Sequence, residues 1–435
     1  MIFLGYLTSL RVQDWFESQA FASSSTSASM GRPIFNSIPH TARYLHHLRC
    51  RVSLVFFILA LLQQQHLFLS SRQSLSAKYS ATNFQSPYGD LHPRYWRTDN
   101  EHLQFQEELV ANRAAWKVLG EGWEGKVFAY KDSVIKTFTP GRSPFRNCAP
   151  HTAIKWPTEI PASLKFGGIG PDHDPNTTYR RFLPVKAYFM ASSSPGAPAE
   201  WHLVTPLLDG GNLGTLAEHL YSSERPRSHR EIDAIFRPVF NRLLTSMSTL
   251  HDAGYCHDDI KPSNIFIQDE SHWMIGDLGN VREVFHPYHS SRIWTDNRQM
   301  GDCRANDAVR ALKAYLKFIQ SSIAYDNEFN VAILGGREPM SRLLWGTLAD
   351  ARYISATELH KRSVVEYPEA SSRAVVDNRV AESTRPATLT GLFSRRLATK
   401  LAVDHALMTR IDESSARWWG MVWLFGLPDA KRCGL

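Results

Sequence analysis

The order of apolar and polar residues divides this chain into an apolar N-terminal run and a longer region with strand and helix patterns. Residues 52–69 are apolar except for Ser53 and a polar notch at 63–66. A membrane span needs about twenty largely apolar residues. The run therefore predicts a single transmembrane anchor at 52–69, with an amphipathic targeting helix as the alternative. Residues 1–51 would form an N-terminal tail, and the polar segment 70–112 would form a stalk.

Downstream of the stalk, the pattern predicts a small lobe of strands followed by a larger lobe of helices. Residues 126–138 read as strand, turn and strand around a Lys-Asp pair. Residues 232–251 carry apolar side chains at helical spacing and lead into a polar loop. We therefore expect an α+β protein with a β-rich domain at 113–208. A helical domain would occupy 209–435 and end in further helices.

The polar loop after the predicted helix carries the strongest chemical signal in the chain. It has the sequence HDDIKPSN at 257–264, and GDLG follows at 276–279. Phosphoryl transfer needs a carboxylate near the acceptor hydroxyl, a cation on the moving phosphate and oxygen ligands for Mg²⁺. An acidic surface loop before a strand is the alternative explanation. The required groups occur in that order at Asp259, Lys261, Asn264 and Asp277.

A glycine-rich segment lies in the predicted small lobe, with the sequence GEGWEGKV at 120–127. Glycines let a backbone approach nucleotide phosphates closely, and a following Val would cover the base. Dinucleotide-binding turns share the pattern, but those open a helix, whereas a strand follows here. The segment therefore predicts a phosphate-binding hairpin. Its candidate nucleotide-binding residues are Gly120, Gly122, Gly125 and Val127.

Lys136, on the second strand of this hairpin, is the candidate that would hold the α- and β-phosphates. A carboxylate should orient it, and the candidate is Glu159, in a short segment between two prolines. Glu159 could instead be a surface residue of a Pro-rich loop, and Glu200 is a poorer rival. The strand at 201–208 would then supply the adenine contacts. Its candidates are Thr205 at the back of the pocket, Pro206 through its carbonyl and Leu208 through its N–H.

From about residue 116 to residue 320, the chain resembles the eukaryotic protein-kinase superfamily, and it looks like a divergent group of kinase-like proteins from filamentous fungi. The resemblance rests on EGWEG at 121–125, WPTEIP at 156–161, CHDDIKPSN at 256–264 and GDLGNVR at 276–282. It implies a bilobal kinase-like fold, ATP with Mg²⁺, and transfer of the γ-phosphate to a hydroxyl. The implied roles are catalytic base for Asp259, phosphate contact for Lys261, metal ligands for Asn264 and Asp277, and ATP positioning for Lys136 paired with Glu159.

Two departures from the family pattern bear on regulation and on the acceptor. The usual His-Arg-Asp has become HDD at 257–259, so an acid replaces the Arg that binds an activation-segment phosphate in that family. No Ala-Pro-Glu follows DLG at 277–279. We expect a protein Ser/Thr hydroxyl as acceptor. A small-molecule or glycan kinase, and a pseudokinase that acts as a nucleotide-binding interaction module, are the alternatives. Asp307 resembles the Asp that anchors the catalytic loop in this superfamily. A helix N-cap is the other explanation for this residue.

The net charge and the cysteine pattern bear on two classes of partner, nucleic acid and zinc, and on the redox state of the compartment. The formal net charge is +7 and the basic residues are dispersed, so nucleic-acid binding is not expected. The five cysteines include no C-x-x-C pair and do not predict a zinc site. Cys256 is expected to be buried. A bridge between Cys148 and Cys303 would be compatible with an oxidising compartment.

The charges that flank the apolar run predict its orientation in the membrane, and the apolar tail raises the question of a second membrane contact. Three arginines lie closely before residues 52–69, whereas one Arg and one Lys follow closely. This excess favours a single-pass protein with a lumenal kinase domain, and a cytoplasmic kinase is the alternative. The apolar tail at 417–428 is too short to span a bilayer. We expect it to form a final helix packed on the large lobe, with membrane contact as the alternative.

Overall fold

The computed structural model describes most of the chain after residue 39. The chain forms two compact units, residues 1–62 and 63–435. The predicted tail up to residue 39 and the predicted stalk at 85–99 lie outside the described residues. The described residues are 40–84, 100–122, 125–139, 145–149, 154–169, 181–194, 196–223, 227–324, 326–367 and 389–428.

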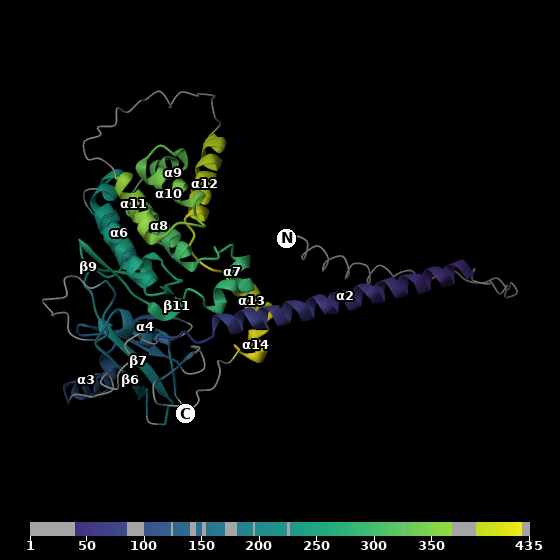
Figure 1. Ribbon diagram of the computed structural model, residues 1–435, viewed down its shortest axis with the longest axis horizontal. Coiled ribbons are helices and arrows are strands. Elements are labelled where there is room, and N and C mark those ends of the chain that lie inside the picture. Colours follow the sequence, from purple (N-terminus) through teal and green to yellow (C-terminus); the bar gives the residue numbers. More distant parts are fainter. Residues whose placement is uncertain are drawn as a thin grey trace, which may run out of the picture. The chain divides into compact units, whose positions relative to one another are not determined.

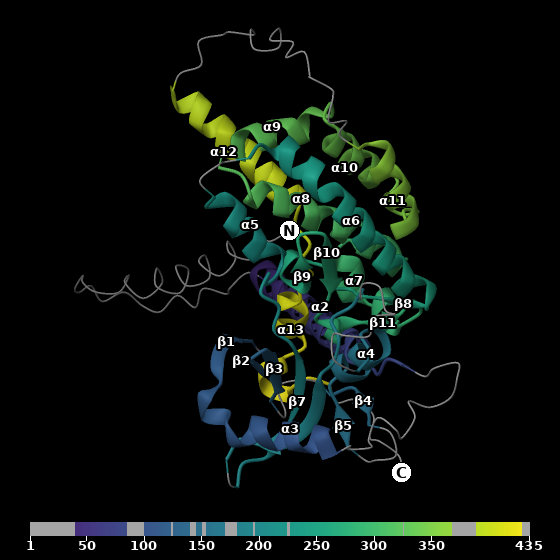
Figure 2. The same cartoon turned by 90° about the vertical axis from the view of Figure 1, so that its left-hand side faces the viewer.

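A five-stranded antiparallel sheet forms the small lobe, with strand order β1-β2-β3-β7-β6 (Figures 1 and 2). The alternation of side chains along a strand puts Ile135 in a core with Leu109 and Trp116, and leaves Lys136 on the other face. The strands are β1 Lys117–Glu121, β2 Gly125–Tyr130, β3 Ser133–Phe138, β6 Ala187–Ser192 and β7 Ala199–Pro206. The lobe also contains helices α3 Asn100–Ala111 and α4 Glu159–Phe166, the turn η2 Arg113–Ala115, and the short pair β4 Asn147–Cys148 and β5 Lys155–Trp156.

Helices form the large lobe around one hydrophobic core. Helix α6 begins with a capping box in which Ser228 and Glu231 bond each other's backbone N–H groups, and its apolar face is buried. Helix α8 is buried on most sides and packs against α6. The helices are α5 Leu213–Tyr221, α6 His229–Asp252, α7 Arg292–Asp296, α8 Cys303–Ser321, α9 Asp326–Gly335, α10 Pro339–Ala349, α11 Ala356–Val365 and α12 Leu389–Ala406. Short strands and turns are β8 Tyr255–Cys256, η3 Pro262–Asn264, β9 Ile265–Asp269, β10 His272–Ile275, η4 Leu278–Asn280, β11 Arg282–Glu283 and η5 Pro287–Ser290.

This arrangement confirms the predicted bilobal α+β fold. The β-rich lobe and the helical lobe follow one another along the chain in the predicted order. The loop between β8 and β9, which carries the HDDIKPSN sequence, lies next to the start of α8. The fold therefore places the chemically informative residues between the two lobes.

Helix α2, His40–Lys78, is longer than the predicted span. Its stretch from His47 to Lys78 is long and apolar enough to cross a membrane, and the large apolar side chains from Val52 to Leu62 are 46–68% exposed. Residues 70–84, which the sequence assigns to a stalk, continue α2 as far as Lys78 and bury Leu75, Tyr79 and Phe84. The reason is packing: Phe84 stacks on Tyr255 of the large lobe with ring centroids 5.6 Å apart.

The apolar tail forms two short helices rather than the single final helix predicted from the sequence. These are α13 Ser414–Trp419 and α14 Val422–Phe425, separated by Gly420 and by Met421, which has a φ of +47°. A left-handed residue interrupts a right-handed helix, so the tail cannot continue as one element. Ala416 and Val422 pack on the large lobe, but other apolar side chains of the tail are exposed.

Candidate active site

Lys136 joins residues from both lobes. Its Nζ donates a hydrogen bond to Glu159 Oε2 at 2.5 Å and to Asp277 Oδ1 at 2.9 Å. Glu159 is the first residue of α4 and is buried, so it is not the surface residue of a Pro-rich loop. Its rival Glu200 instead pairs with Arg113 at 3.6 Å. The structure thus brings together three residues that the sequence proposes for nucleotide and metal binding.

Burial and charge act in opposite directions on these three side chains. Burial alone would lower the pKa of Lys136, but the carboxylates of Asp277 and Glu159 outweigh it and raise that pKa above its usual value. The Lys136 ammonium in turn lowers the pKa of Asp277. Lys136 is therefore charged and Asp277 ionised at neutral pH. These are the states that bind a polyphosphate and a divalent cation.

Asp259, Lys261 and Asn264 lie together on the loop between β8 and β9. Lys261 Nζ donates to Asp259 Oδ2 at 2.8 Å, and Asn264 Nδ2 donates to the Asp259 carbonyl at 2.9 Å. Pro262 starts the η3 turn and so directs Asn264 back toward Asp259. Because Nδ2 faces Asp259, Oδ1 is the atom that Asn264 can offer to a cation. With the Asp277 carboxylate it gives an all-oxygen ligand set, which fits Mg²⁺.

The loop is held from behind by Asp307 on α8. This fully buried carboxylate accepts hydrogen bonds from the N–H groups of His257, at 2.6 Å, and Asp258, at 3.0 Å. Arg310, one turn further along α8, donates to the Asp258 carbonyl at 2.6 Å. Asp307 is not the N-cap of α8, because Asp302 caps that helix. The anchoring geometry is therefore present, and the N-cap explanation is wrong.

Asp258, which replaces the usual Arg, forms a buried ionic cluster with the segment after Asp277. Its Oδ2 lies 3.0 Å from Arg282 Nη1 and 2.9 Å from His289 Nε2. The other ring nitrogen of His289 lies 3.0 Å from the Val284 carbonyl, so each ring nitrogen faces an oxygen acceptor. Burial would raise the pKa of Asp258, but His289, Arg282 and Arg310 hold it well below its usual value.

This cluster was not predicted, although a signal for it exists in the sequence. An acid at a position that usually carries Arg needs an opposite charge nearby once it is buried. Arg282 lies in the GDLGNVR motif and was available for that pairing. In the family pattern, an Arg at position 258 binds a phosphate on the segment after Asp277. Here position 258 carries the acid, and that segment carries the cation, Arg282.

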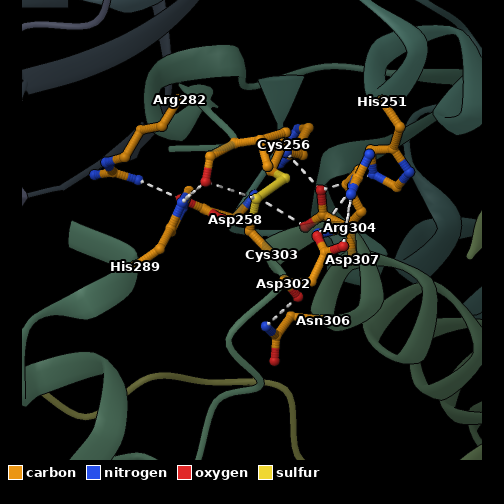
Figure 3. Close-up of a disulfide and its surroundings, with 12 residues drawn as sticks. His251, Cys256, Asp258, Arg282, His289, Asp302, Cys303, Arg304, Asn306 and Asp307 are labelled. Atoms are coloured by element: carbon orange, nitrogen blue, oxygen red, sulfur yellow. Dashed lines mark hydrogen bonds and ion pairs between the residues drawn. A yellow bond between two sulfur atoms is a disulfide. The ribbon is translucent and has the colours of Figure 1, made fainter. Parts of the chain in front are cut away.

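A disulfide between Cys256 and Cys303 crosses the centre of this region (Figure 3). It joins β8, directly before the catalytic loop, to the first residue of α8. In Figure 3, Asp258 with Arg282 and His289 lies on one side of the bridge, and Asp307 lies on the other. The pairing of Cys148 with Cys303 considered from the sequence is wrong, since Cys303 is bonded to Cys256.

The bridge also removes the candidate metal sites in this region. Among the described residues, two sets of His, Cys and Asp side chains lie close enough to share an ion, and each includes a cysteine of the disulfide. A bonded sulfur is no longer a thiolate ligand. The sets are His251, Cys256 and Asp307, and Asp258, Cys303 and His289.

The glycine-rich hairpin and the hinge occupy the expected places in the small lobe. Gly122 N–H donates to the Gly125 carbonyl at 2.9 Å and closes the turn between β1 and β2, whose residues 123–124 lie outside the described part. A Cβ at Gly125 would lie 1.7 Å from the Thr137 carbonyl oxygen, whereas one at Gly120 would meet nothing within 4 Å. Gly125 is thus needed for the close approach of β2 to β3, which differs from the predicted reason of phosphate approach.

The hinge residues end β7 beside Lys136. Thr205 pairs with Val134 on β3, and Pro206 pairs with Ser133. The next N–H, of Leu207, donates to the Asp132 carbonyl at 2.9 Å. Leu208 follows the strand, and its N–H makes no hydrogen bond to another described residue. Its assignment as the adenine donor stays a prediction.

A cavity of about 710 Å³ lies beside Asp259 and Lys261. Neither Lys136 nor Asp277 lines it, so it suits an acceptor rather than the nucleotide. Its outer wall is a C-terminal strap, residues 409–417, held by two hydrogen bonds between Asn297 and the Asp412 backbone. The lining residues are Lys78, Asp258, Asp259, Lys261, Asn280, Arg282, Tyr288, Thr409, Arg410, Ile411, Asp412, Glu413, Ser414 and Arg417.

Comparison with known proteins agrees with this geometry. The protein kinase domain family matches residues 187–299, which include the catalytic loop and the metal-binding turn. This chain carries a domain of the eukaryotic protein-kinase-like superfamily. The narrower likeness to a filamentous-fungal group stays a prediction.

Three similar proteins illustrate the extent of the likeness. An interferon-induced, double-stranded RNA-activated protein kinase of Rattus norvegicus is 38% identical over 66 residues, 15% of this chain and 12% of that kinase. The serine/threonine-protein kinase PknL of Mycobacterium tuberculosis is 35% identical over 82 residues, 19% of this chain and 18% of its own length. A mitosis inhibitor protein kinase of Candida albicans is 25% identical over 161 residues, 37% of this chain and 13% of that protein. The chain therefore spans under a fifth of the length of these relatives.

The Asp258 cluster leads to a first prediction. Arg282→Met would remove one of the two ion-pair partners of the buried Asp258 carboxylate and should lower the free energy of unfolding by about 3–5 kcal/mol in urea denaturation. Arg292→Met, at an exposed position of the same segment, should change it by less than about 0.5 kcal/mol. Because the pKa of Asp258 is lowered, its stabilising effect is present above the unfolded pKa of about 4 and is lost as pH falls further.

The same cluster predicts activity without phosphorylation of residues 278–302. Asp258 already has a cation as partner and would repel a phosphate. Phosphatase-treated protein should therefore keep its transfer rate. A large loss on dephosphorylation that an upstream kinase restores would contradict the assignment.

Proposed function

We propose that this protein is an ATP-dependent phosphotransferase of kinase fold that transfers the γ-phosphate to a hydroxyl group, with protein Ser/Thr as the acceptor. The observation that carries the proposal is the assembly of Lys136, Glu159 and Asp277 opposite Asp259 and Lys261. The printed names of similar proteins, which include a serine/threonine-protein kinase, favour a protein acceptor.

Each side chain has a role that follows from its chemistry. Lys136, fixed by Glu159, would bind the α- and β-phosphate oxygens, and the backbone of the glycine-rich hairpin would cover them. The acceptor oxygen forms a bond to the γ-phosphorus while the bond from the β–γ bridging oxygen breaks and ADP leaves. Asp259 takes the proton of the hydroxyl, and Lys261 balances charge on the phosphoryl group.

Asn264 and Asp277 would hold Mg²⁺, which supplies positive charge for the phosphate oxygens when it is bound. The presence of all these polar groups argues against a pseudokinase. The small-molecule alternative has one observation in its favour, because the strap encloses the acceptor side as a cavity.

Nucleotide binding is the first test of the proposal. Millimolar ATP with Mg²⁺ should raise the thermal midpoint, because a ligand that binds only the folded state stabilises it. Lys136→Met and Asp277→Asn should each abolish most of that shift. Lys186→Met removes an ion pair of the small lobe with Asp132 and serves as the matched control. An unchanged shift in both site variants would reject the assignment.

The role of Asp259 is tested by kinetics. Asp259→Asn keeps the shape of the side chain but removes the base. It should lower turnover by about two orders of magnitude or more while the ATP-dependent thermal shift stays nearly intact. Full turnover in this variant would remove Asp259 from the mechanism.

For localisation, we infer a single-pass membrane protein whose kinase domain faces an oxidising, lumenal compartment. Apolar side chains exposed along α2 favour contact with lipid. The positions of the cysteines support the orientation. Cys148, Cys256 and Cys303, which all follow the apolar run, are disulfide-bonded. Disulfides persist in oxidising compartments and are rare in the cytosol.

The anchor is tested in microsomes with the full-length chain. Carbonate should leave the protein in the membrane, and a C-terminal tag should resist protease until detergent is added. Replacing Phe57 and Leu59 with Arg should release it, because each Arg at the centre of a span costs about 2.5–3.5 kcal/mol. Release of the unaltered chain would dismiss the anchor, and digestion of the tag in intact vesicles would reverse the orientation.

A further inference from the structure

The C-terminal helices α13 and α14 present a cluster of exposed aromatic and apolar side chains. Trp418 is 67% exposed, Trp423 71%, Leu424 59% and Phe425 56%. With Trp419, which is 37% exposed, five large apolar residues lie within eight positions, unlike the singly exposed residues found on most protein surfaces. Soluble proteins rarely leave such a group in water unless a partner covers it.

This cluster lies beside the C-terminal part of α2. The ring of Phe425 packs edge-on against Phe68 at a centroid distance of 5.7 Å. Arg72 Nη1 donates to the Gly426 carbonyl at 2.5 Å, and Trp419 lines a small cavity of about 70 Å³ together with Leu67. In Figure 1 the yellow α13 and α14 adjoin the end of α2 that enters the folded domain. The exposed aromatic surface is thus continuous with the end of the apolar helix.

The residues around the cluster match those found at a membrane surface. Trp rings concentrate where hydrocarbon meets headgroups, because one edge is apolar and the indole N–H is polar. Arg72 also lies beside the cluster, where its guanidinium holds the Gly426 carbonyl at the end of α14. Helix α14 has only four residues, so it is far too short to cross a bilayer of about 30 Å. The cluster can therefore reach only the shallow, interfacial layer of a bilayer.

We propose that Trp418, Trp423, Leu424 and Phe425 insert into the interfacial layer of the membrane that α2 crosses, and so form a second contact of the kinase domain with lipid. The proposal rests on the membrane anchor inferred above but not on phosphotransfer. The occupant is the lipid surface rather than a second protein, because the cluster adjoins the apolar helix directly. The contact is apolar and does not require anionic lipid.

The experiment uses the full chain in phosphatidylcholine nanodiscs and lipids brominated at defined depths, which quench Trp fluorescence by contact. Lipid brominated near the headgroups should quench the unaltered protein more than lipid brominated at the bilayer centre. The Trp418→Phe/Trp423→Phe double variant should lose most of the quenching by the shallow lipid. Trp345→Phe, which removes a 40% exposed Trp from α10 in the helical lobe, should keep it.

Each result decides the question. Equal quenching of the double variant and the unaltered protein would place the cluster away from lipid and overturn the proposal. Stronger quenching by the deep lipid would overturn the shallow position. The far-UV circular dichroism and thermal midpoint of each variant without nucleotide report folding separately, so a misfolded variant is recognised and replaced by the corresponding single substitution. Release of the chain from vesicles by carbonate would refute the anchor itself, independently of the quenching result.

Discussion

The buried carboxylate of Asp307 is the constraint on which the catalytic loop depends. A fully buried charge is costly unless hydrogen bonds compensate it, and here two consecutive backbone N–H groups of the loop do so. The geometry of the loop is therefore fixed by a helix of the core. The disulfide fixes the same two elements covalently, because Cys303 opens that helix and Cys256 precedes the loop. Asp259 thus directly follows three residues that are tied to α8, one by the disulfide and two by hydrogen bonds.

The charge of Asp258 organises the other side of the loop. Kinases that need an added phosphate use an Arg at this position, whereas this chain has reversed the charges and supplies Arg282 and His289 from the following segment. Asp258 adopts a left-handed backbone with a φ of +64°. Such strain persists when the surrounding contacts over-determine it, and the ionic cluster together with Asp307 provides those contacts.

Local sequence was enough to predict the parts of the site that follow fixed spacings. The alternation along β3 places Lys136 opposite the core, and the proline-bounded segment places Glu159 at a helix start. Contacts between distant segments were not predictable in this way. The pairing of Cys256 with Cys303, the Arg282 contact and the packing of residues 70–84 depend on which segments the fold brings together. The burial of Leu75 and Tyr79 is an example, because a local pattern cannot show the apolar surface on which they pack. The roles assigned to the site residues stay predictions.

The cavity wall has a consequence for how such proteins diversify. The match to the protein kinase domain ends at residue 299, whereas the outer wall of the cavity beside Asp259 is built from Lys78 and residues 409–417. Asp258, Asp259 and Lys261 line the same cavity and lie within the match, so one wall of the cavity belongs to the family region and the other does not. Substitutions in residues 409–417 can therefore change the shape of the cavity and leave the catalytic loop unaltered, so related chains are free to differ there.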